Sequence, residues 1–366
     1  MLNDHKELSQ ATPADAPYTV ASHEVPMQPA SLDIWDKKYA LKTKLGVAID
    51  LSIDDTYKRV AGTLADCETE KRDYWYEEFL YAMRNGAIPA GRIVSNAGAQ
   101  AYKPSTSLIN CTVSGTIHDS MENILQRVTE AGLTLKAGCG IGYEFSTLRP
   151  QGAFVAGAGA STSGPLSFMD IYDKMCLTVS SAGGRRGAQM GTFDVSHPDV
   201  VSFIKAKRAD GCLRQFNLSL LITDDFIDAV KNDLEWPLVF PVLASEAAEM
   251  DFDDEKQVIY RDWANKEDGY TVREDGMVAC RVYQRISAKK LFNVIMSSTY
   301  DYAEPGFILI DRVNEQNNNW FCETAIRATN PFQCGHTQRV RKISSNFLEA
   351  QSWATGRKQG SQACAA

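Results

Sequence analysis

The sequence lacks the features that mark several large classes of protein. No run of about 18 apolar residues is present, so no transmembrane helix is expected. Residues 1–34 lack a basic start followed by an apolar run, which argues against a secretory signal and makes a cytoplasmic location the default expectation. The formal net charge of −8 disfavours non-specific binding to nucleic acid or to a membrane surface.

Common site-forming motifs are also missing. No two of the nine cysteines lie three residues apart, which excludes a CxxC zinc or thioredoxin site. None of the five histidines pairs with another at metal-ligand spacing, so no metal site is predicted. A P-loop and a Gly-x-Ser-x-Gly elbow are absent as well. In a reducing cytoplasm the cysteines should be mostly thiols.

The 366 residues, 44% of them apolar, are enough for two domains or for one large α/β unit with appendages. The spacing of Trp75, Phe79 and Met83 indicates a helix within a helical stretch over 35–86. Strands are predicted at 107–113, 213–221, 238–243 and 307–310, and helices at 121–135, 165–179, 199–208, 224–232 and 288–299. This alternation predicts an α/β fold with mainly parallel strand pairing.

Composition divides the chain into four parts. Residues 1–34 are predicted to be a mobile tail, 35–100 a helical region, and 101–330 the α/β part. Residues 331–366 hold five basic residues and one acidic residue, a net charge of +4, whereas the preceding residues carry −12. This last part is either a disordered extension or sequence that does not belong to the same evolved fold.

Two glycine-rich stretches have competing interpretations. Residues 137–145 do not fit a dinucleotide-binding fingerprint, because Tyr143 stands where the third glycine is needed. They form either a tight backbone turn or a backbone that closely approaches a phosphate. Residues 180–190 present Arg185 and Arg186 either on a solvated loop or on a loop that moves when a nucleotide binds. Cys111, taken alone, is better explained as a buried structural residue.

Eight short runs follow one another in a distinctive order. They are 88–98 (IPAGRIVSNAG), 110–113 (NCTV), 138–142 (GCGIG), 148–150 (LRP), 164–169 (GPLSFM), 183–188 (GGRRGA), 216–220 (FNLSL) and 328–331 (ATNP). Together they resemble the large catalytic chain of a ribonucleotide reductase, most like the adenosylcobalamin-dependent class II, over about residues 35–331. The resemblance implies a helical N-terminal region followed by the first half of a ten-stranded α/β barrel.

The resemblance also implies chemistry and partners. Family chemistry replaces the ribonucleotide 2′-OH with hydrogen through a thiyl radical, and two further cysteines supply electrons. It implies a ribonucleotide substrate, adenosylcobalamin, a dNTP or ATP specificity effector, a homodimer and a thioredoxin-like reductant.

Individual positions match family roles. Cys111 matches the first cysteine of the redox pair, and Asn330 the residue that orients the ribose. The implied substrate-binding residues are Gly91, Asn110, Cys111 and Gly140. The implied effector-binding residues are Asp119, Arg149, Gly183, Gly184 and Arg186.

The sequence departs from the family at the finger loop. The family reads Asn-Pro-Cys-Gly-Glu, whereas residues 330–336 read NPFQCGH. Cys334, the candidate radical cysteine, therefore lies two residues late, and His336 stands where the family has Glu. The second redox cysteine and the second half of the barrel do not follow, which a frameshift, a split gene or a truncation would explain.

Three interpretations result: a truncated or split reductase, a nucleotide-binding or regulatory chain that needs a complementing C-terminal chain, or an aggregation-prone open half-barrel. A class I chain remains the alternative to class II, and the choice between diphosphate and triphosphate substrates stays open.

Overall fold

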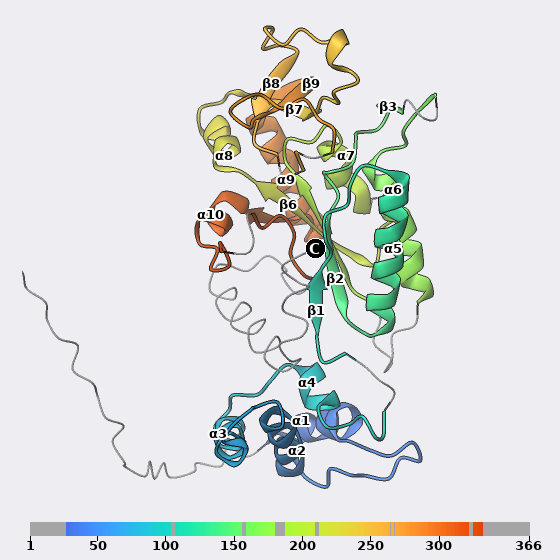
Figure 1. The fold of residues 1–366 in the computed structure, drawn as a ribbon, viewed down its shortest axis with the longest axis vertical. Helices are drawn as coiled ribbons and strands as arrows, with labels where there is room; N and C mark the ends of the chain where they lie inside the picture. Colours follow the sequence, from blue (N-terminus) through green and yellow to red (C-terminus); the bar gives the residue numbers. More distant parts are fainter. Residues whose placement is uncertain are drawn as a thin grey trace, which may run out of the picture.

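The computed structural model describes residues 27–103, 107–155, 159–179, 187–208, 212–263, 265–266, 268–321 and 325–331. Figure 1 shows a helical region at one end of the molecule, a parallel sheet with its helices in the middle, and a small antiparallel sheet at the other end. Among the described residues, no helix is both long and apolar enough to cross a bilayer.

The helical region forms a small core of its own. It contains α1 (Pro29–Ile34), a π-helix (Trp35–Tyr39), α2 (Ile53–Ala65), α3 (Arg72–Arg84) and α4 (Gly91–Asn96). Ser52 begins α2 with a capping box, in which its side chain accepts from the backbone N–H of Asp55. Val60, Leu80 and Ile93 join α2, α3 and α4 in one apolar cluster. The helix predicted around Trp75 is thus confirmed as α3.

One prediction for this region was wrong in detail, because a helix occupies Pro29–Ile34, within the residues 1–34 predicted to be a mobile tail. Pro at the first helical position explains this start, because its fixed φ suits a helix N-terminus. Residues 91–96 form α4, which Arg92 connects to the carbonyl of Gly138. That tertiary contact is not visible in local sequence.

The central sheet has five strands, all parallel, in the order β1-β2-β5-β6-β10. They are β1 (Cys111–Val113), β2 (Gly140–Glu144), β5 (Gln189–Asp194), β6 (Phe216–Ile222) and β10 (Gly306–Leu309). The helices that pack on it include α5 (Met121–Lys136), α6 (Pro165–Thr178), α7 (Val200–Lys205) and α9 (Ala288–Tyr302). The predicted helical region followed by a parallel α/β domain is therefore confirmed.

The remaining elements extend this frame. They are β3 (Phe154–Val155), β4 (Ala160–Ser161), η2 (Ala206–Arg208), α8 (Asp224–Lys231), β7 (Glu235–Pro241), η3 (Ala247–Glu249), β8 (Val258–Arg261), β9 (Val278–Ser287) and α10 (Ile310–Glu315). An antiparallel sheet in the order β7-β9-β8 was not predicted as such. Of the strand predicted at 107–113, only residues 111–113 are extended into the sheet.

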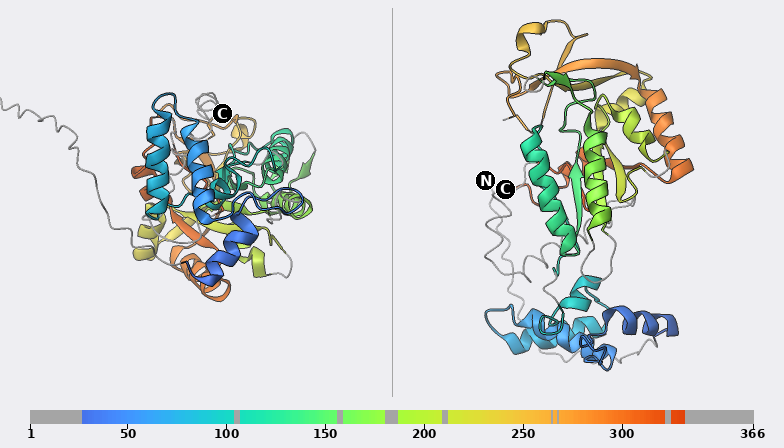
Figure 2. Two further views of the ribbon diagram at one scale, coloured as in Figure 1. Left: turned by 90° about the horizontal axis from the view of Figure 1, so that it is seen from below. Right: turned by 90° about the vertical axis from the view of Figure 1, so that its right-hand side faces the viewer.

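The sheet has one face covered by helices and one inner face. Ile141 and Tyr143 of β2 point into the core with Tyr172 of α6, and all three side chains are buried there. Because side chains alternate along a strand, Gly140, Gly142 and Glu144 face the other way. Figure 2 shows α5 and α6 side by side on the covered face.

Candidate active and effector sites

Cys111 and Gly140 are neighbours on the inner face of the sheet. They are register partners in β1 and β2, and the N–H of Gly140 donates to the carbonyl of Asn110 at 3.0 Å. A Cβ placed on Gly140 would lie 2.9 Å from Cys111 Sγ and 3.1 Å from Pro331 Cγ. Glycine is required because the thiol and the proline ring occupy this space.

Residues 325–331, which we call the inner segment, lie against this face. The carbonyl of Arg327 accepts from the Thr192 hydroxyl at 3.0 Å, and that of Pro331 accepts from the Asn217 side-chain amide at 2.9 Å. A Cβ on Gly142 would lie 1.8 Å from the carbonyl oxygen of Thr329. The segment thus crosses from β5 past β2 to β6, with Asn330 placed between these anchors.

A side-chain amide also fixes the start of the inner segment. Asn314 of α10 donates to the carbonyl of Ile326 at 3.0 Å and accepts from its N–H at 2.6 Å. This reciprocal pair of hydrogen bonds resembles one between two strands. It satisfies both backbone polar groups of Ile326 at the start of the inner segment.

The structure brings together four of the predicted substrate and catalytic residues: Asn110, Cys111, Gly140 and Asn330. Gly91 lies at the first turn of α4, where its Cα faces the ring of Tyr39. The neighbouring Arg92 connects α4 to the other four residues, because its guanidinium donates to the carbonyl of Gly138, two residues before Gly140. Cys334 lies outside the described residues.

Asp119 and Arg149, predicted as effector residues, form a close ion pair. Arg149 Nε lies 2.6 Å from Asp119 Oδ2, and Arg149 Nη1 donates to the carbonyl of Phe154 at 3.0 Å. Burial raises the pKa of Asp119, although the guanidinium opposes that change. Asp268 lies beside the pair and binds His118 Nδ1 at 2.6 Å. The other predicted effector residues, Gly183, Gly184 and Arg186, lie outside the described residues.

The N-cap of α5 sets the position of Asp119. The Ser120 hydroxyl accepts from the N–H of Asn123, as predicted for the start of this helix. Arg149 follows the turn after β2, so one helix start and one strand end meet at the ion pair. A guanidinium held at this point is suited to a phosphate, and a carboxylate to a ribose hydroxyl.

The turn that carries Arg149 is clamped at both ends. The His197 ring donates from Nε2 to the carbonyl of Leu148 at 3.0 Å and accepts from the N–H of Asp199 at its Nδ1. Asp199 in turn accepts from the N–H of Gln151 at 2.8 Å. His197 must therefore be neutral, and burial lowers its pKa.

This clamp predicts that stability falls on acidification below about pH 6.5, the unfolded pKa of histidine. Below this pH, His197 is protonated in the unfolded state but stays neutral in the native state, whose His197 pKa is lower. The free energy of unfolding therefore decreases by at most about 1.4 kcal/mol per pH unit. Urea unfolding between pH 7.5 and 5.5 measures this slope. His197→Gln should be less stable at pH 7.5 but should show a flatter slope. A slope equal to that of the wild type in His197→Gln would contradict the prediction.

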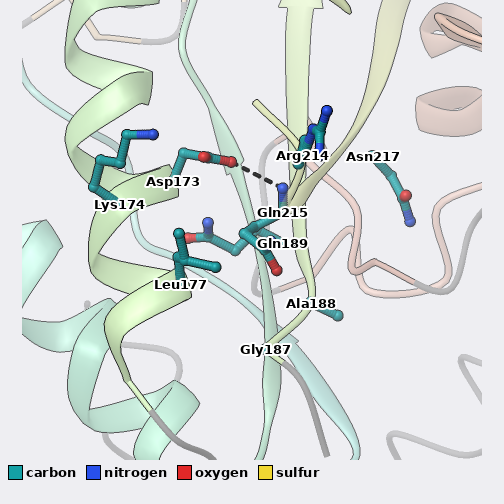
Figure 3. A pocket seen from close by; sticks show the side chains of 9 residues that line it. All are labelled: Asp173, Lys174, Leu177, Gly187, Ala188, Gln189, Arg214, Gln215 and Asn217. Carbon is teal, nitrogen blue, oxygen red and sulfur yellow. Dashed lines mark hydrogen bonds between the residues drawn. The ribbon is translucent and has the colours of Figure 1, made fainter. Parts of the chain in front are cut away.

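A cavity of about 800 Å³ lies at the amino ends of β5 and β6 (Figure 3). It is lined by Asp173, Lys174, Leu177, Gly187, Ala188, Gln189, Arg214, Gln215 and Asn217. Asp173 is already engaged, because it accepts from the N–H of Gln215 at 2.8 Å. Asn217 connects this cavity to the inner segment, since its amide binds Pro331.

Sequence reasoning missed several residues that shape the site. Thr192 and Asn217 anchor the inner segment, and Glu144 faces Arg327 within it. Asn217 stood in the run FNLSL, and a polar residue inside an apolar strand could have marked it. Among the described residues, no group of three His, Cys, Asp or Glu side chains could hold a metal ion.

Comparisons with known proteins agree with this geometry. The family model "Ribonucleotide reductase, all-alpha domain" matches residues 27–101, and "Ribonucleotide reductase, barrel domain" matches residues 109–334. A vitamin B12-dependent ribonucleoside-diphosphate reductase of Mycobacterium tuberculosis is 30% identical over 329 residues, which cover 88% of this chain and 41% of that protein.

Other relatives are more distant. A vitamin B12-dependent ribonucleoside-diphosphate reductase of Thermoplasma acidophilum is 29% identical over 63% of this chain and 25% of its own length. A ribonucleoside-diphosphate reductase subunit alpha of Helicobacter pylori is 25% identical over 77% of this chain and 34% of its own. The chain thus spans at most about two fifths of the length of these relatives. With both family models matched in order along the fold, the chain belongs to the ribonucleotide reductase large-chain family.

Proposed function

We propose that the protein acts in the reduction of ribonucleotides to 2′-deoxyribonucleotides, with these residues forming the first half of the catalytic barrel. The observation that carries the proposal is the meeting of Cys111, Gly140 and the Asn330–Pro331 stretch on one inner face. In this reading the Cys111 thiol donates electrons to the substrate. The amides of Asn110 and Asn330 orient the ribose, and the missing Cβ of Gly140 lets the Cys111 sulfur and the Pro331 ring lie close together.

The substrate class follows from the relatives, whose names specify ribonucleoside diphosphates. We therefore assign a ribonucleoside diphosphate to this protein, with a thioredoxin-like dithiol restoring the reduced cysteines. A reducing compartment such as the cytoplasm would keep Cys111 in the thiol form, outside any disulfide.

Adenosylcobalamin is the proposed source of the radical, because several relatives are named as vitamin B12-dependent. The described residues do not by themselves fit this large cofactor. The buried His197 uses both ring nitrogens within the protein, and the cavity at β5 and β6 is lined mainly by polar side chains. We therefore assign the corrin to the assembled protein, in which it would supply the radical.

A dNTP or ATP effector is proposed at Asp119 and Arg149. Arg149→Met removes a charge-assisted contact of about 1.5–3 kcal/mol, which corresponds to a roughly tenfold to hundredfold weaker binding of the effector. Isothermal titration of dNTPs and ATP into the chain measures this loss. Arg84→Met is the matched control, because Arg84 pairs with Asp54 in the distant helical region. Equal affinity of the Arg149 variant and the wild type would remove this site from the proposal.

A homodimer would complete the effector site. With 16 residues, α5 is about 24 Å long and separates Asp119 from the amino end of β5, the strand that follows the predicted effector residues Gly183, Gly184 and Arg186 in the sequence. A nucleotide does not bridge that length, but an antiparallel second copy would bring its own loop to Asp119. Leu125 and Leu133 of α5 and Leu177 of α6 are exposed, which gives such a contact apolar surface.

A complementing C-terminal chain is the other proposed partner. In the five-stranded sheet β1 and β10 are the edge strands, and Phe307 and Leu309 of β10 are exposed. Edge strands present backbone groups that pair with further strands, so a second half-barrel would find its place there.

A second candidate function is nucleotide binding without turnover. It is favoured by one observation: the Asp119–Arg149 pair is complete in this chain, whereas Cys334 lies two residues away from the family position. The deciding assay supplies ribonucleoside diphosphates or triphosphates, adenosylcobalamin and a dithiol to the chain. It is run alone and with the C-terminal part of the Mycobacterium tuberculosis relative. Deoxynucleotide formation supports the reductase, and effector binding without product supports the second candidate.

A further inference from the structure

Four charged side chains gather at the carboxyl ends of β2 and β5, around the inner face of the sheet. They are Glu144, Asp194, Arg261 and Arg327. Glu144 and Asp194 are both buried nearly completely. Buried charges are costly unless they are paired, so the pairing in this cluster matters.

The carboxylate of Asp194 has its hydrogen-bond donors in the turn that follows β5, and its nearby cation, Arg261, at the end of β8. It accepts from the N–H of Ser196 at 2.8 Å and from the Ser196 hydroxyl, to which Arg261 also donates. Although burial acts in the opposite direction, Arg261 and Ser196 hold the pKa of Asp194 below its usual range. Arg327 of the inner segment adds to this lowering of the pKa, but the hydrogen bonds of Asp194 to Ser196 do not involve that segment.

Glu144 depends on the inner segment for its counter-ion. It accepts from the Ser146 hydroxyl at 2.9 Å, and Arg327 Nη1 lies 3.8 Å from its Oε1. Burial raises the pKa of Glu144, Asp194 adds to that rise, and Arg327 and Ser146 oppose it. Arg327 is thus the cation that opposes the rise in the pKa of this buried carboxyl group.

Arg327 is also the residue at which the inner segment becomes fixed to the sheet. Its carbonyl accepts from Thr192, Thr329 follows over Gly142, and Pro331 ends on Asn217. A slip by one residue would move Asn330 by about 3.3 Å along the sheet. Such a shift exceeds the tolerance of a catalytic arrangement, in which 1 Å already matters.

We propose that Glu144 and Arg327 are positioning residues, whose ion pair sets the register of the inner segment and so holds Asn330 and Pro331 over Cys111 and Gly140. The role in catalysis rests on the proposed reductase function, but the placement of the segment does not. Pro331 packs against the same space as the Cys111 sulfur, so a loosened segment uncovers the thiol.

Alkylation of Cys111 by iodoacetamide, followed by mass spectrometry of the native full chain, tests the placement directly. Arg327→Met and Glu144→Gln should each raise the alkylation rate about tenfold at one fixed pH. This factor corresponds to a loss of roughly 1.4 kcal/mol from the free energy that holds the inner segment over Cys111. Arg327→Lys, which keeps the charge, should stay within about threefold of wild type. Arg84→Met serves as the control for loss of an arginine elsewhere.

The possible results separate this proposal from the reductase function. Unchanged alkylation in both Arg327→Met and Glu144→Gln overturns the positioning role, whether or not the protein reduces ribonucleotides. Raised alkylation with normal effector affinity supports it even if no product forms. If Arg327→Met does not fold, the nearly isosteric Glu144→Gln decides, because it removes the same ion pair without changing the side chain's size.

Discussion

Replacing Cys111 by serine is expected to lower deoxynucleotide formation by about 10³-fold or more, while dNTP binding at Asp119 and Arg149 stays unchanged. Serine has no sulfur to be oxidised to a disulfide, so the electrons for replacing the 2′-OH are lost. The replacement is small, and Cys111 lies in the short strand β1 at the sheet edge, so the fold should persist. Product analysis of the assembled protein, with and without the substitution, measures the effect.

Cys67→Ser is the matched control. Cys67 is an exposed thiol just after α2, in the helical region and away from the inner face of the sheet. Its loss should leave both product formation and effector binding at wild-type values. If Cys111→Ser kept full activity, or if Cys67→Ser reduced it equally, Cys111 would not be an electron donor.

Gly142→Ala is expected to decrease the free energy of unfolding by about 3 kcal/mol. Its Cβ would lie 1.8 Å from the carbonyl oxygen of Thr329 and 2.8 Å from the carbonyl carbon. These are backbone atoms of the inner segment, which is anchored on both sides, so the clash cannot be relieved by a rotamer change. Urea denaturation followed by tryptophan fluorescence gives the change.

Gly132→Ala provides the contrast for Gly142→Ala. Gly132 lies within α5, and the nearest atom to an added Cβ is Met175 Sδ at 3.5 Å, an ordinary contact. Alanine there should be neutral or should stabilise the helix by up to about 1 kcal/mol. A Gly142→Ala protein as stable as Gly132→Ala would show that the inner segment does not lie against β2.

Local sequence patterns predicted the elements that are stabilised locally. The helix α5 was predicted at 121–135, and the hydroxyl of Ser120 caps its start. The helix α3 was predicted from Trp75, Phe79 and Met83, and Gly86 follows its end at φ +95°. In both cases the signals lie within a few residues of the element that they specify.

The strand β2 was not predicted, because its glycines are needed for contacts with a segment that is distant in the sequence. Glycine is a poor strand former, and Gly140 and Gly142 within three residues suggested a turn. Their strand conformation is selected by Cys111, Thr329 and Pro331, which need the space that a side chain would take. No local rule contains that information, because the inner segment is nearly 190 residues further along the chain.

The candidate site residues were predicted mainly through the family resemblance, and their roles stay predictions. Cys111 alone looked like a buried structural residue, and Asp119 and Arg149 lie 30 residues apart. Only the order of the motifs indicated a shared function for them. The Glu144–Arg327 pair could not be predicted in this way, since it joins a strand end to the inner segment and belongs to no motif that we used.

A crystal structure of the chain assembled with its complementing half, grown with a ribonucleoside diphosphate and a dNTP, would test the central claim most directly. We expect the ribose of the substrate beside Cys111, Asn110 and Asn330, and the dNTP with its phosphates on Arg149 and its ribose on Asp119. A substrate bound elsewhere, with the inner segment away from Gly142 and Cys111, would contradict the proposed active site.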